Sequence, residues 1–286
     1  MRGTKVQVAG KVIVVSGAGS GIGRELALLL ASRKAIVVGV DYDEKSISET
    51  RELVTDLGGV MSAHVIDVSK QEQIETLVQD TIRIHGSVSG LINNAGIIHA
   101  HSHIETLPQV QVERVFNVNW WGTYYMTLAF LPALRVQPEA FISNVSSMGG
   151  YMPFPGQVAY GASKAAVKLL TEGLRVELKQ NSNIHVSVVY PGAVKSGITE
   201  NSPDVSTKFK KKAREMDPSK EVGVSSLKAA AKIIKGIERN SSRILVGPDS
   251  WAIDKLYRLM PVAMASLMSW IMAKVAGDQF EEFHGG

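Results

Sequence analysis

Short apolar runs alternate with longer segments of helical periodicity along most of the chain. Seven runs rich in β-branched residues have the length and composition of strands buried on both faces: KVIVVS, AIVVGV, AHVI, GLINN, AFISNV, IHVSVVY and RILVG. Between them, segments such as residues 24–33 and 71–85 place apolar side chains at helical spacing. This alternation predicts an α/β fold: a Rossmann-type, doubly wound parallel sheet of about seven strands, with helices on both faces and right-handed crossovers.

Two regions depart from this alternation. Residues 195–222 form a long polar connection that contains KFKKKAR, and connections of this length in compact domains are usually functional lids or helical insertions. Residues 251–286 form an extension rich in Met, Ala and Leu, which we expect to be apolar and helical. Because no Pro/Gly/Ser-rich linker interrupts residues 1–250, we expect one domain there, followed by the extension.

Composition narrows the class of protein. The 286 residues are 45% hydrophobic and 20% charged, which allows a substantial core. The absence of cysteine excludes disulfides and thiolate metal sites. The net charge of +4 is small, so nucleic acid is not expected as the main partner. No apolar run is long enough to span a bilayer, and MRGTKVQVAGKVIVV lacks the apolar region of a signal peptide, so we expect a cytoplasmic protein.

A glycine-rich turn follows the first predicted strand. In SGAGSGIG, Gly17, Gly21 and Gly23 have the spacing G-x-x-x-G-x-G immediately before a helical segment. Glycine allows a tight turn and close backbone approach, while free N–H groups at a helix start attract phosphate. The position directly after the first strand favours a dinucleotide site over a turn without a ligand, and Ser20 and Ile22 complete the loop.

The second predicted strand ends at Asp41, whose type bears on the choice of dinucleotide. An acidic side chain there can accept hydrogen bonds from both hydroxyls of an adenosine ribose and repels a 2′-phosphate. Ser20, just before Gly21, takes a position where a cation would favour that phosphate. We therefore expect NAD (NADH), with NADP less favoured. Asp43 and Glu44 are expected to begin the next helix, because carboxylates interact favourably with the positive end of the helix dipole.

Tyr160 and Lys164 are four residues apart in a predicted helix and therefore share a face. A free tyrosine has a pKa near 10, and a nearby ammonium, together with a positively charged nicotinamide, lowers that pKa by favouring the phenolate. The phenol then becomes a useful general acid or base. The small residues 161–163 are expected to leave room for a ligand. Ser147 lies at the end of the strand before this helix, where its hydroxyl could reach the same carbonyl oxygen of that ligand as the phenol does.

In order and spacing, these motifs resemble the short-chain dehydrogenase/reductase family over about residues 8–250. Further matches are IDVS with Asp67, NNAG at 93–96, VNWWG with Asn119, and YPGAVKS at 190–196. The resemblance implies that residues 1–250 form one Rossmann dinucleotide-binding and catalytic domain. It also implies a homo-oligomer, a dimer or tetramer, because members of the family often associate through corresponding helices.

The family pattern assigns catalytic roles to Asn119, Ser147, Tyr160 and Lys164. By this resemblance, Tyr160 exchanges a proton with the substrate oxygen and Ser147 orients that oxygen. Lys164 binds the nicotinamide ribose and lowers the tyrosine pKa, and Asn119 binds a water of the proton relay. The implied cofactor contacts are Gly17, Ser20, Gly21, Ile22, Gly23, Asp41, Asp67, Val68, Asn94, Ala95, Gly96, Tyr160, Lys164, Pro191, Gly192, Val194 and Ser196. Ser16 stands where threonine is commoner and keeps a hydroxyl that ties the glycine loop to the NNAG strand.

These parts predict an NAD-dependent oxidoreductase that moves a hydride between nicotinamide and a carbinol or carbonyl carbon. The neighbouring apolar residues favour a small hydrophobic secondary alcohol or ketone, such as a steroid, aromatic or long-chain compound; they are Met148, Tyr151, Met152, Phe154, Pro155, Val158 and Ala193. One alternative is a 3-oxoacyl thioester reductase, against which Asp41 argues because such enzymes usually use NADPH. The other is an inactive nucleotide-binding scaffold, against which the complete Asn/Ser/Tyr/Lys set argues.

Three further features have competing interpretations. The histidines of HAHSH, at 99, 101 and 103, suggest a metal, but no supporting ligands are visible, and we expect a polar loop near the site and no metal. Trp120 and Trp121 are expected to pack in the core or at an oligomer contact, or to line the site. The basic run at 208–214 is either a solvated helix face or attracts an anionic group or a membrane surface.

The C-terminal extension leaves three interpretations open. Residues 259–273, LMPVAMASLMSWIMA, contain no charge and are bounded by Arg258 and Lys274. This segment is too short to span a bilayer easily. It either packs on a neighbouring subunit or covers the substrate pocket, lies in a membrane interface as part of a peripheral contact through residues 251–283, or is loosely ordered.

Overall fold

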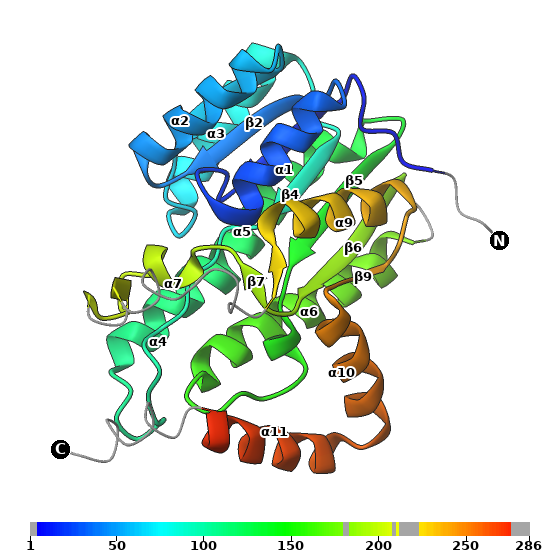
Figure 1. Ribbon diagram of the computed structural model, residues 1–286. Coiled ribbons are helices and arrows are strands. Elements are labelled where there is room, and N and C mark those ends of the chain that lie inside the picture. Colours follow the sequence, from blue (N-terminus) through cyan, green and yellow to red (C-terminus); the bar gives the residue numbers. More distant parts are fainter. Residues whose placement is uncertain (1–4, 180–182, 208–209, 212–222, 276–286) are drawn as a thin grey trace.

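The computed structural model describes residues 5–179, 183–207, 210–211 and 223–275. Its centre is a seven-stranded parallel sheet with the strand order β3-β2-β1-β4-β5-β6-β9 (Figure 1). The strands are β1 (Val12–Ser16), β2 (Ile36–Asp41), β3 (Val60–Val65), β4 (Gly90–Asn93), β5 (Ala140–Val145), β6 (Ile184–Pro191) and β9 (Arg243–Val246). The predicted doubly wound parallel sheet is confirmed.

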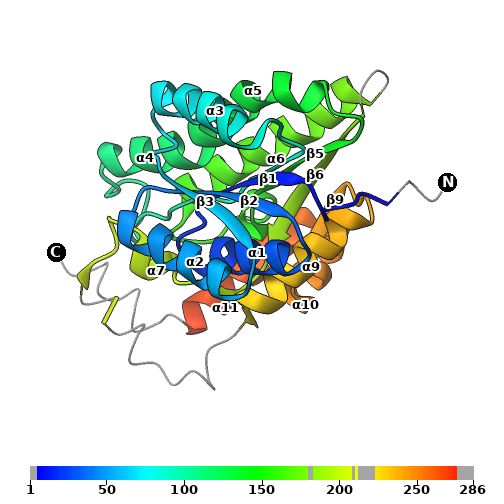
Figure 2. The same ribbon diagram turned by 90° about the horizontal axis from the view of Figure 1, so that it is seen from above.

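Helices cover both faces of the sheet, as Figure 2 shows from above. One face carries α1 (Gly21–Ser32), α2 (Glu44–Asp56) and α9 (Ser226–Glu238). The other carries α3 (Gln71–His85), α4 (Gln109–Phe116), α5 (Gly122–Arg135) and α6 (Val158–Leu178). Each layer encloses its own apolar cluster, one built around Leu26, Leu30 and Ile233 and the other around Leu77, Leu91 and Phe130.

Central and edge strands differ in burial. Every residue of β1, β4 and β5 is buried, as the uninterrupted apolar runs in the sequence predict. In contrast, β3 is an edge strand whose end residues Val60 and Val65 are exposed, and it begins three residues before the segment AHVI from which it was predicted. The expectation of burial on both faces is therefore wrong for β3, because no further strand covers its outer edge.

The α2 start follows the sequence prediction. Asp43 is the N-cap residue and its carboxylate accepts a hydrogen bond from the main-chain N–H of Ser46, with Glu44 in the first turn. The cap satisfies one of the free N–H groups of the helix and places an acidic side chain near its positive end.

The remaining elements lie around the carboxyl ends of the strands. A π-helical turn η1 (Asn117–Trp121) joins α4 to α5, and a 3₁₀ turn η2 (Met148–Gly150) precedes α6. The short parallel pair β7 (Val194–Lys195) and β8 (Val224–Ser225) joins the two ends of the long polar connection, which includes α7 (Ile198–Asn201). Most of the basic run at 208–214 lies outside the described residues.

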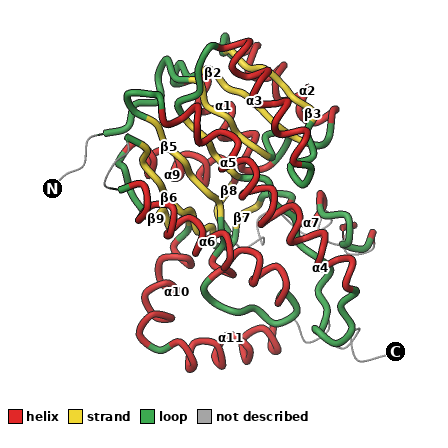
Figure 3. Tube along the Cα trace, turned by 180° about the vertical axis from the view of Figure 1, so that it is seen from behind, coloured by secondary structure: helices red, strands yellow, loops and turns green. Residues whose placement is uncertain are grey.

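Two helices follow β9 at the C-terminal side. Helix α10 (Pro248–Leu259) packs against the sheet end, and α11 (Pro261–Val275) runs crosswise to it, as the view from behind shows (Figure 3). Within the described residues, no helix is long and apolar enough to cross a membrane. The predicted boundary at residue 250 falls inside α10.

Candidate active site

A cavity of about 620 Å³ opens at the carboxyl ends of the strands, where the strand order reverses between β1 and β4. Ligands of open α/β sheets bind at such a switch point. The cavity extends along the sheet from the end of β2 to the start of α6. Its volume lies within the range of small-molecule and cofactor sites.

The glycine loop forms one wall of this cavity. Gly17 and Gly21 have positive φ angles of 66° and 51°, which glycine adopts without strain. A Cβ atom added to Gly21 would lie 2.3 Å from the Ser196 carbonyl oxygen, so no other residue fits there. Helix α1 begins at Gly21 and directs its free N–H groups toward the cavity. Gly23 does not line the cavity; it allows α1 to approach the Gly17 carbonyl.

At one end of the cavity lies the Asp41 carboxylate. One of its oxygens accepts from the Gly19 N–H at 2.8 Å and the other from the Asp43 N–H at 3.2 Å. Burial raises the pKa of Asp41, and these main-chain hydrogen bonds oppose the rise by stabilising the charged form. The nearby Arg24 guanidinium is engaged with the Gly19 carbonyl, Thr50 and Glu49, so Asp41 is not neutralised by it.

The segments after β3 and β4 form the middle of the cavity, with Asp67, Val68, Asn94, Ala95 and Gly96 among its lining residues. The main-chain N–H groups of Asn94 and Ala95 donate to the Ser16 hydroxyl at 3.0 and 3.1 Å. The predicted tie between the glycine loop and the NNAG strand is confirmed.

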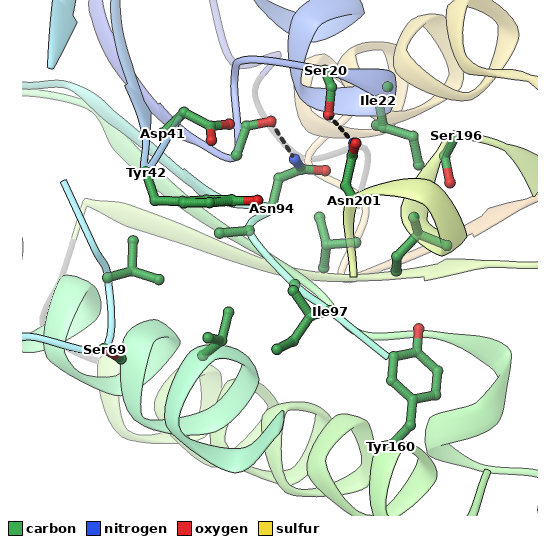
Figure 4. A pocket seen from close by; sticks show the side chains of 18 of the residues that line it. Ser20, Ile22, Asp41, Tyr42, Ser69, Asn94, Ile97, Tyr160, Ser196 and Asn201 are labelled. Atoms are coloured by element: carbon green, nitrogen blue, oxygen red, sulfur yellow. Dashed lines mark hydrogen bonds between the residues drawn. The ribbon is translucent and has the colours of Figure 1, made fainter. Parts of the chain in front are cut away.

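Tyr160, Ser147 and Lys164 line the opposite end of the cavity. Figure 4 shows the Tyr160 hydroxyl directed into the cavity, with Ile97 beside it and Asp41 and Tyr42 far along the groove. The Ser147 hydroxyl forms a hydrogen bond with the phenol. Lys164 is almost fully buried one helical turn after Tyr160, and its ammonium donates to the Val145 carbonyl at 3.0 Å.

The pKa shifts of this pair differ from the sequence expectation. Burial raises the pKa of Tyr160, and the hydrogen bond from Ser147 opposes this rise; no lowering by Lys164 accompanies them. Burial also lowers the pKa of Lys164 to about 8. The expected tyrosine of lowered pKa is therefore wrong for the protein alone, because burial disfavours both the phenolate and the ammonium.

Asn119 lies behind the cavity wall rather than on it. Its side-chain amide donates to the Ile97 carbonyl and to the Ser163 hydroxyl, both at 3.0 Å, and accepts from the Ile97 N–H at 2.9 Å. It occupies the π-helical turn η1, and a Cβ atom added to Gly96 would contact both Asn119 and the Lys164 ammonium. The amide therefore shapes the wall beside Lys164.

The structure places two sets of sequence-predicted residues of this region outside the lining of the cavity. The small residues after Tyr160 serve packing, since Gly161 lies against the Gly149 carbonyl and Ser163 is fully buried against Asn119. The residues expected to line a substrate site, Met148, Tyr151, Phe154 and Ala193, lie outside the cavity. The Tyr151 hydroxyl donates to the Ser250 carbonyl, and the Ala193 N–H donates to Asp249, so both contact the start of α10 instead.

Sequence reasoning missed several residues that line the cavity. They are Tyr42, Asp43, Ser46, Ile66, Ser69, Ile97, Val110, Glu113, Arg114, Asn117, Val118, Val145, Ser146, Ile198, Asn201 and Pro203. Tyr42 and Ser69 are neighbours of predicted residues. The cavity-lining residues of α4 and α7 could not be predicted in this way, because no local pattern in the sequence indicates that these two helices lie over the cavity.

The other singled-out residues lie away from the cavity. Among the described residues, no group of His, Asp or Glu side chains is arranged to bind a metal. His99 is buried and hydrogen-bonds the Ala100 carbonyl, while Gln157 contacts both His99 and His101. Trp120 and Trp121 of η1 pack with Tyr124 and Tyr125 of α5 in a partly exposed aromatic cluster, not in the core.

Comparisons with known proteins define the class. The family model for short chain dehydrogenases matches residues 11–206. The chain therefore belongs to the short-chain dehydrogenase/reductase family: it is an oxidoreductase that acts on CH–OH groups and uses a nicotinamide cofactor.

Individual relatives agree with this assignment. SadH of Mycobacterium tuberculosis, a candidate oxidoreductase by its name, is 32% identical over 93% of this chain and 96% of its own. The 11-beta-hydroxysteroid dehydrogenase A of Sesamum indicum is 38% identical over 68% of this chain, which matches 55% of that protein. A short chain dehydrogenase/reductase from Burkholderia phymatum in complex with NAD superposes with a TM-score of 0.80 at 27% identity, covering 88% of this chain and 94% of that one.

Proposed function

We propose that this protein is an NAD-dependent oxidoreductase that interconverts a hydrophobic secondary alcohol and its ketone, with Tyr160 as the general acid and base. The observation that carries the proposal is the single cavity that joins Tyr160, Ser147 and Lys164 at one end to Asp41 at the other. The glycine loop, the free N–H groups of α1 and the Asp41 carboxylate suit the phosphates and adenosine ribose of a dinucleotide.

When bound, the nicotinamide supplies the carbon that accepts or donates the hydride. The residues of the chain manage the accompanying proton. Ser147 donates to the substrate oxygen and fixes its position, while the Tyr160 phenolate takes the hydroxyl proton in oxidation and the phenol returns it in reduction. Because burial disfavours the phenolate, the positive charge of Lys164 beneath it is needed to offset this cost. Asn119 fixes the wall beside Lys164.

The preference for NAD rests on Asp41. Its carboxylate is oriented by two main-chain N–H groups, and the nearby Arg24 is committed to other partners. A 2′-phosphate at this position would meet the negative charge of Asp41, and the described cation beside it, Arg24, is already engaged.

The hydrophobic nature of the substrate is supported by the wall around Tyr160. Ile97 lies beside Tyr160, and Val194, Ile198 and Pro203 contribute further apolar surface to the same cavity (Figure 4). The similarity to a hydroxysteroid dehydrogenase points in the same direction. The 3-oxoacyl thioester reductase remains the second candidate, because FabG of Thermotoga maritima is 32% identical over 70% of this chain.

A substrate screen tests the proposal. Purified protein is supplied with NAD or NADP and a panel of steroid, aromatic and long-chain secondary alcohols, and with NADH or NADPH and the matching ketones and acyl thioesters, while absorbance of the reduced cofactor is followed. We expect turnover of hydrophobic alcohols and ketones with NAD(H). Preferred turnover of acyl thioesters would support the second candidate, and absence of turnover across the panel would support the inactive scaffold.

We also propose that the chain forms a homo-oligomer through α5 and α6. Both helices present large apolar side chains to solvent, among them Leu128 of α5 and Leu169 and Val176 of α6. Burial of such side chains between copies is favourable. Sedimentation equilibrium of the wild type and of a Leu169→Glu/Val176→Glu variant checks this, since the variant should dissociate.

A further inference from the structure

Helix α9 carries a row of cations on its outer face. Lys228, Lys232, Lys235 and Arg239 follow one another at one helical turn each and are all exposed, while the apolar side of the helix packs on the sheet. Among the residues that the structure describes, none of these four cations forms an ion pair. The acidic Glu238 on the same helix is paired with Arg33, so this row is not neutralised from within α9.

The row forms one side of a shallow groove that reaches α10. The strand β9 lies at its base, and Trp251 of α10 lies on the other side. The ammonium of Lys255 sits 3.9 Å from the centre of the Trp251 ring, which adds a further cation to this surface. The carboxylate of Asp254 is nearly buried and pairs with Arg243 and Arg258, so it does not offset the positive surface.

Beyond the groove, the end of α10 and helix α11 expose apolar side chains. Leu259 is 77% exposed, Val262 79% and Trp270 56%. Met264 is buried, but the part of α11 before Lys274 contains no charged residue and also exposes Leu267. No described residue of α10 or α11 lines the cavity that contains Tyr160, which argues against the pocket-cover interpretation.

We propose that the cationic groove of α9 and the apolar end of α10–α11 together bind the surface of a bilayer that contains anionic phospholipid. The helices α9, α10 and α11 follow one another along one side of the molecule (Figures 1 and 2). Phosphate headgroups complement the lysines, while tryptophan and aliphatic side chains enter the boundary between headgroups and acyl chains. At 15 residues, α11 extends about 22 Å, less than the ~30 Å hydrocarbon core, so it lies on the bilayer instead of crossing it.

Charge favours this occupant over a second copy of the chain. A two-fold interface brings the same patch of both subunits together, so an unpaired row of cations would meet its own copy. An anionic lipid surface neutralises the row and buries the apolar helix in one step.

Sedimentation of the full chain with vesicles tests the proposal, using phosphatidylcholine alone or mixed with phosphatidylglycerol. We expect binding only to the mixed vesicles, weakening as salt is raised. The variant Lys228→Gln/Lys232→Gln/Lys235→Gln should bind roughly a hundredfold more weakly, about fivefold for each lysine. The variant Leu259→Ser/Val262→Ser should also lose binding, since both residues are exposed and their replacement leaves the core intact.

A matched control removes three other exposed cations, Arg51→Gln/Arg83→Gln/Lys179→Gln, and should bind as the wild type does. Turnover of a small soluble ketone should be the same in all four proteins, so failure of this proposal is distinct from failure of the proposed activity. The proposal is overturned if the wild type does not bind, if the control loses as much binding as the lysine variant, or if inorganic phosphate at matched ionic strength displaces the vesicles. It is also overturned if the variant Leu259→Ser/Val262→Ser forms a smaller oligomer than the wild type but binds the mixed vesicles equally well.

Discussion

At the scale of single residues, the site carries a cost to stability. Lys164 is buried beneath Tyr160, and burial lowers its pKa from 10.5 to about 8. Below pH 8 the amine is charged in both the folded and the unfolded protein, so the full desolvation cost is present. Between pH 8 and 10.5 only the unfolded protein keeps the proton, so this residue makes stability rise with pH across that window.

Replacing Lys164 by methionine should therefore stabilise the fold while abolishing turnover. At neutral pH the gain is at most about 3 kcal/mol, because the shift of the lysine pKa sets its upper limit and the hydrogen bond to Val145 is lost. Denaturant unfolding from pH 7 to 10.5 measures this. The difference between variant and wild type should shrink as pH rises, and a variant that is less stable at every pH contradicts the interpretation.

The Asp41 carboxylate provides a second residue-scale prediction. Asp41→Ala removes the charge that repels a 2′-phosphate, so kcat/KM for NADP relative to NAD should rise by about tenfold or more. Steady-state kinetics with both cofactors check this. The matched control is Asp56→Ala, at the exposed end of α2, which should leave the ratio unchanged. A wild type that already prefers NADP would contradict the role given to Asp41.

At the scale of elements, α7 and the residues after it are linked to three parts of the site. Asn201 donates to the Ser20 hydroxyl of the glycine loop at 2.8 Å, and the Ser202 hydroxyl accepts from the Ile98 N–H at 2.9 Å. Asp204 pairs with Arg114 of α4. These contacts place α7 over the cavity from which a dinucleotide must dissociate.

Removal of the first of these contacts should loosen cofactor binding. Asn201→Ala should raise the dissociation constant of NADH by about two- to tenfold, since it removes one exposed hydrogen bond to the glycine loop. Titration of NADH fluorescence measures it. Glu200→Ala, on the same short helix but without a contact to the glycine loop, is the control, and equal effects of the two substitutions would contradict the linkage.

Elements differ in how far the sequence could predict them. The buried strands and the glycine loop depend on local patterns, so their positions were predicted closely, apart from the edge strand β3. The contacts of Asn201 and Asp204 join residues far apart in sequence across a polar connection with no periodicity, and no local signal indicates them. The same reason applies to the hydrogen bond from the Tyr151 hydroxyl to α10, which also joins residues far apart in sequence.

At the scale of the whole molecule, one network connects the C-terminal helices to the sheet. Arg243 of β9 donates to Glu172 of α6 at 3.1 Å and to Asp254 of α10 at 2.6 Å, with its guanidinium 4.6 Å from the centre of the Tyr190 ring. The Ser250 hydroxyl donates to the Tyr190 carbonyl. We therefore propose that α10 belongs with the sheet domain and that a separable extension begins near Met260.

Loss of this network should destabilise the molecule as a whole. Arg243→Ala leaves the nearly buried Asp254 with Arg258 as its one ion-pair partner among the described residues, and we expect a loss of about 2–3 kcal/mol in the free energy of unfolding. Arg33→Ala breaks a more exposed pair with Glu238 and should cost about 1 kcal/mol or less. Urea unfolding compares them, and equal losses would contradict the central place of Arg243.

The central claim is that Tyr160 transfers the proton in a cavity shared with the dinucleotide. Its most direct test is Tyr160→Phe, measured as turnover of the best alcohol from the screen together with NADH affinity. We predict that kcat falls by about a hundredfold to ten-thousandfold, as expected for loss of a general acid or base, while NADH affinity is unchanged. Turnover close to that of the wild type would contradict the account.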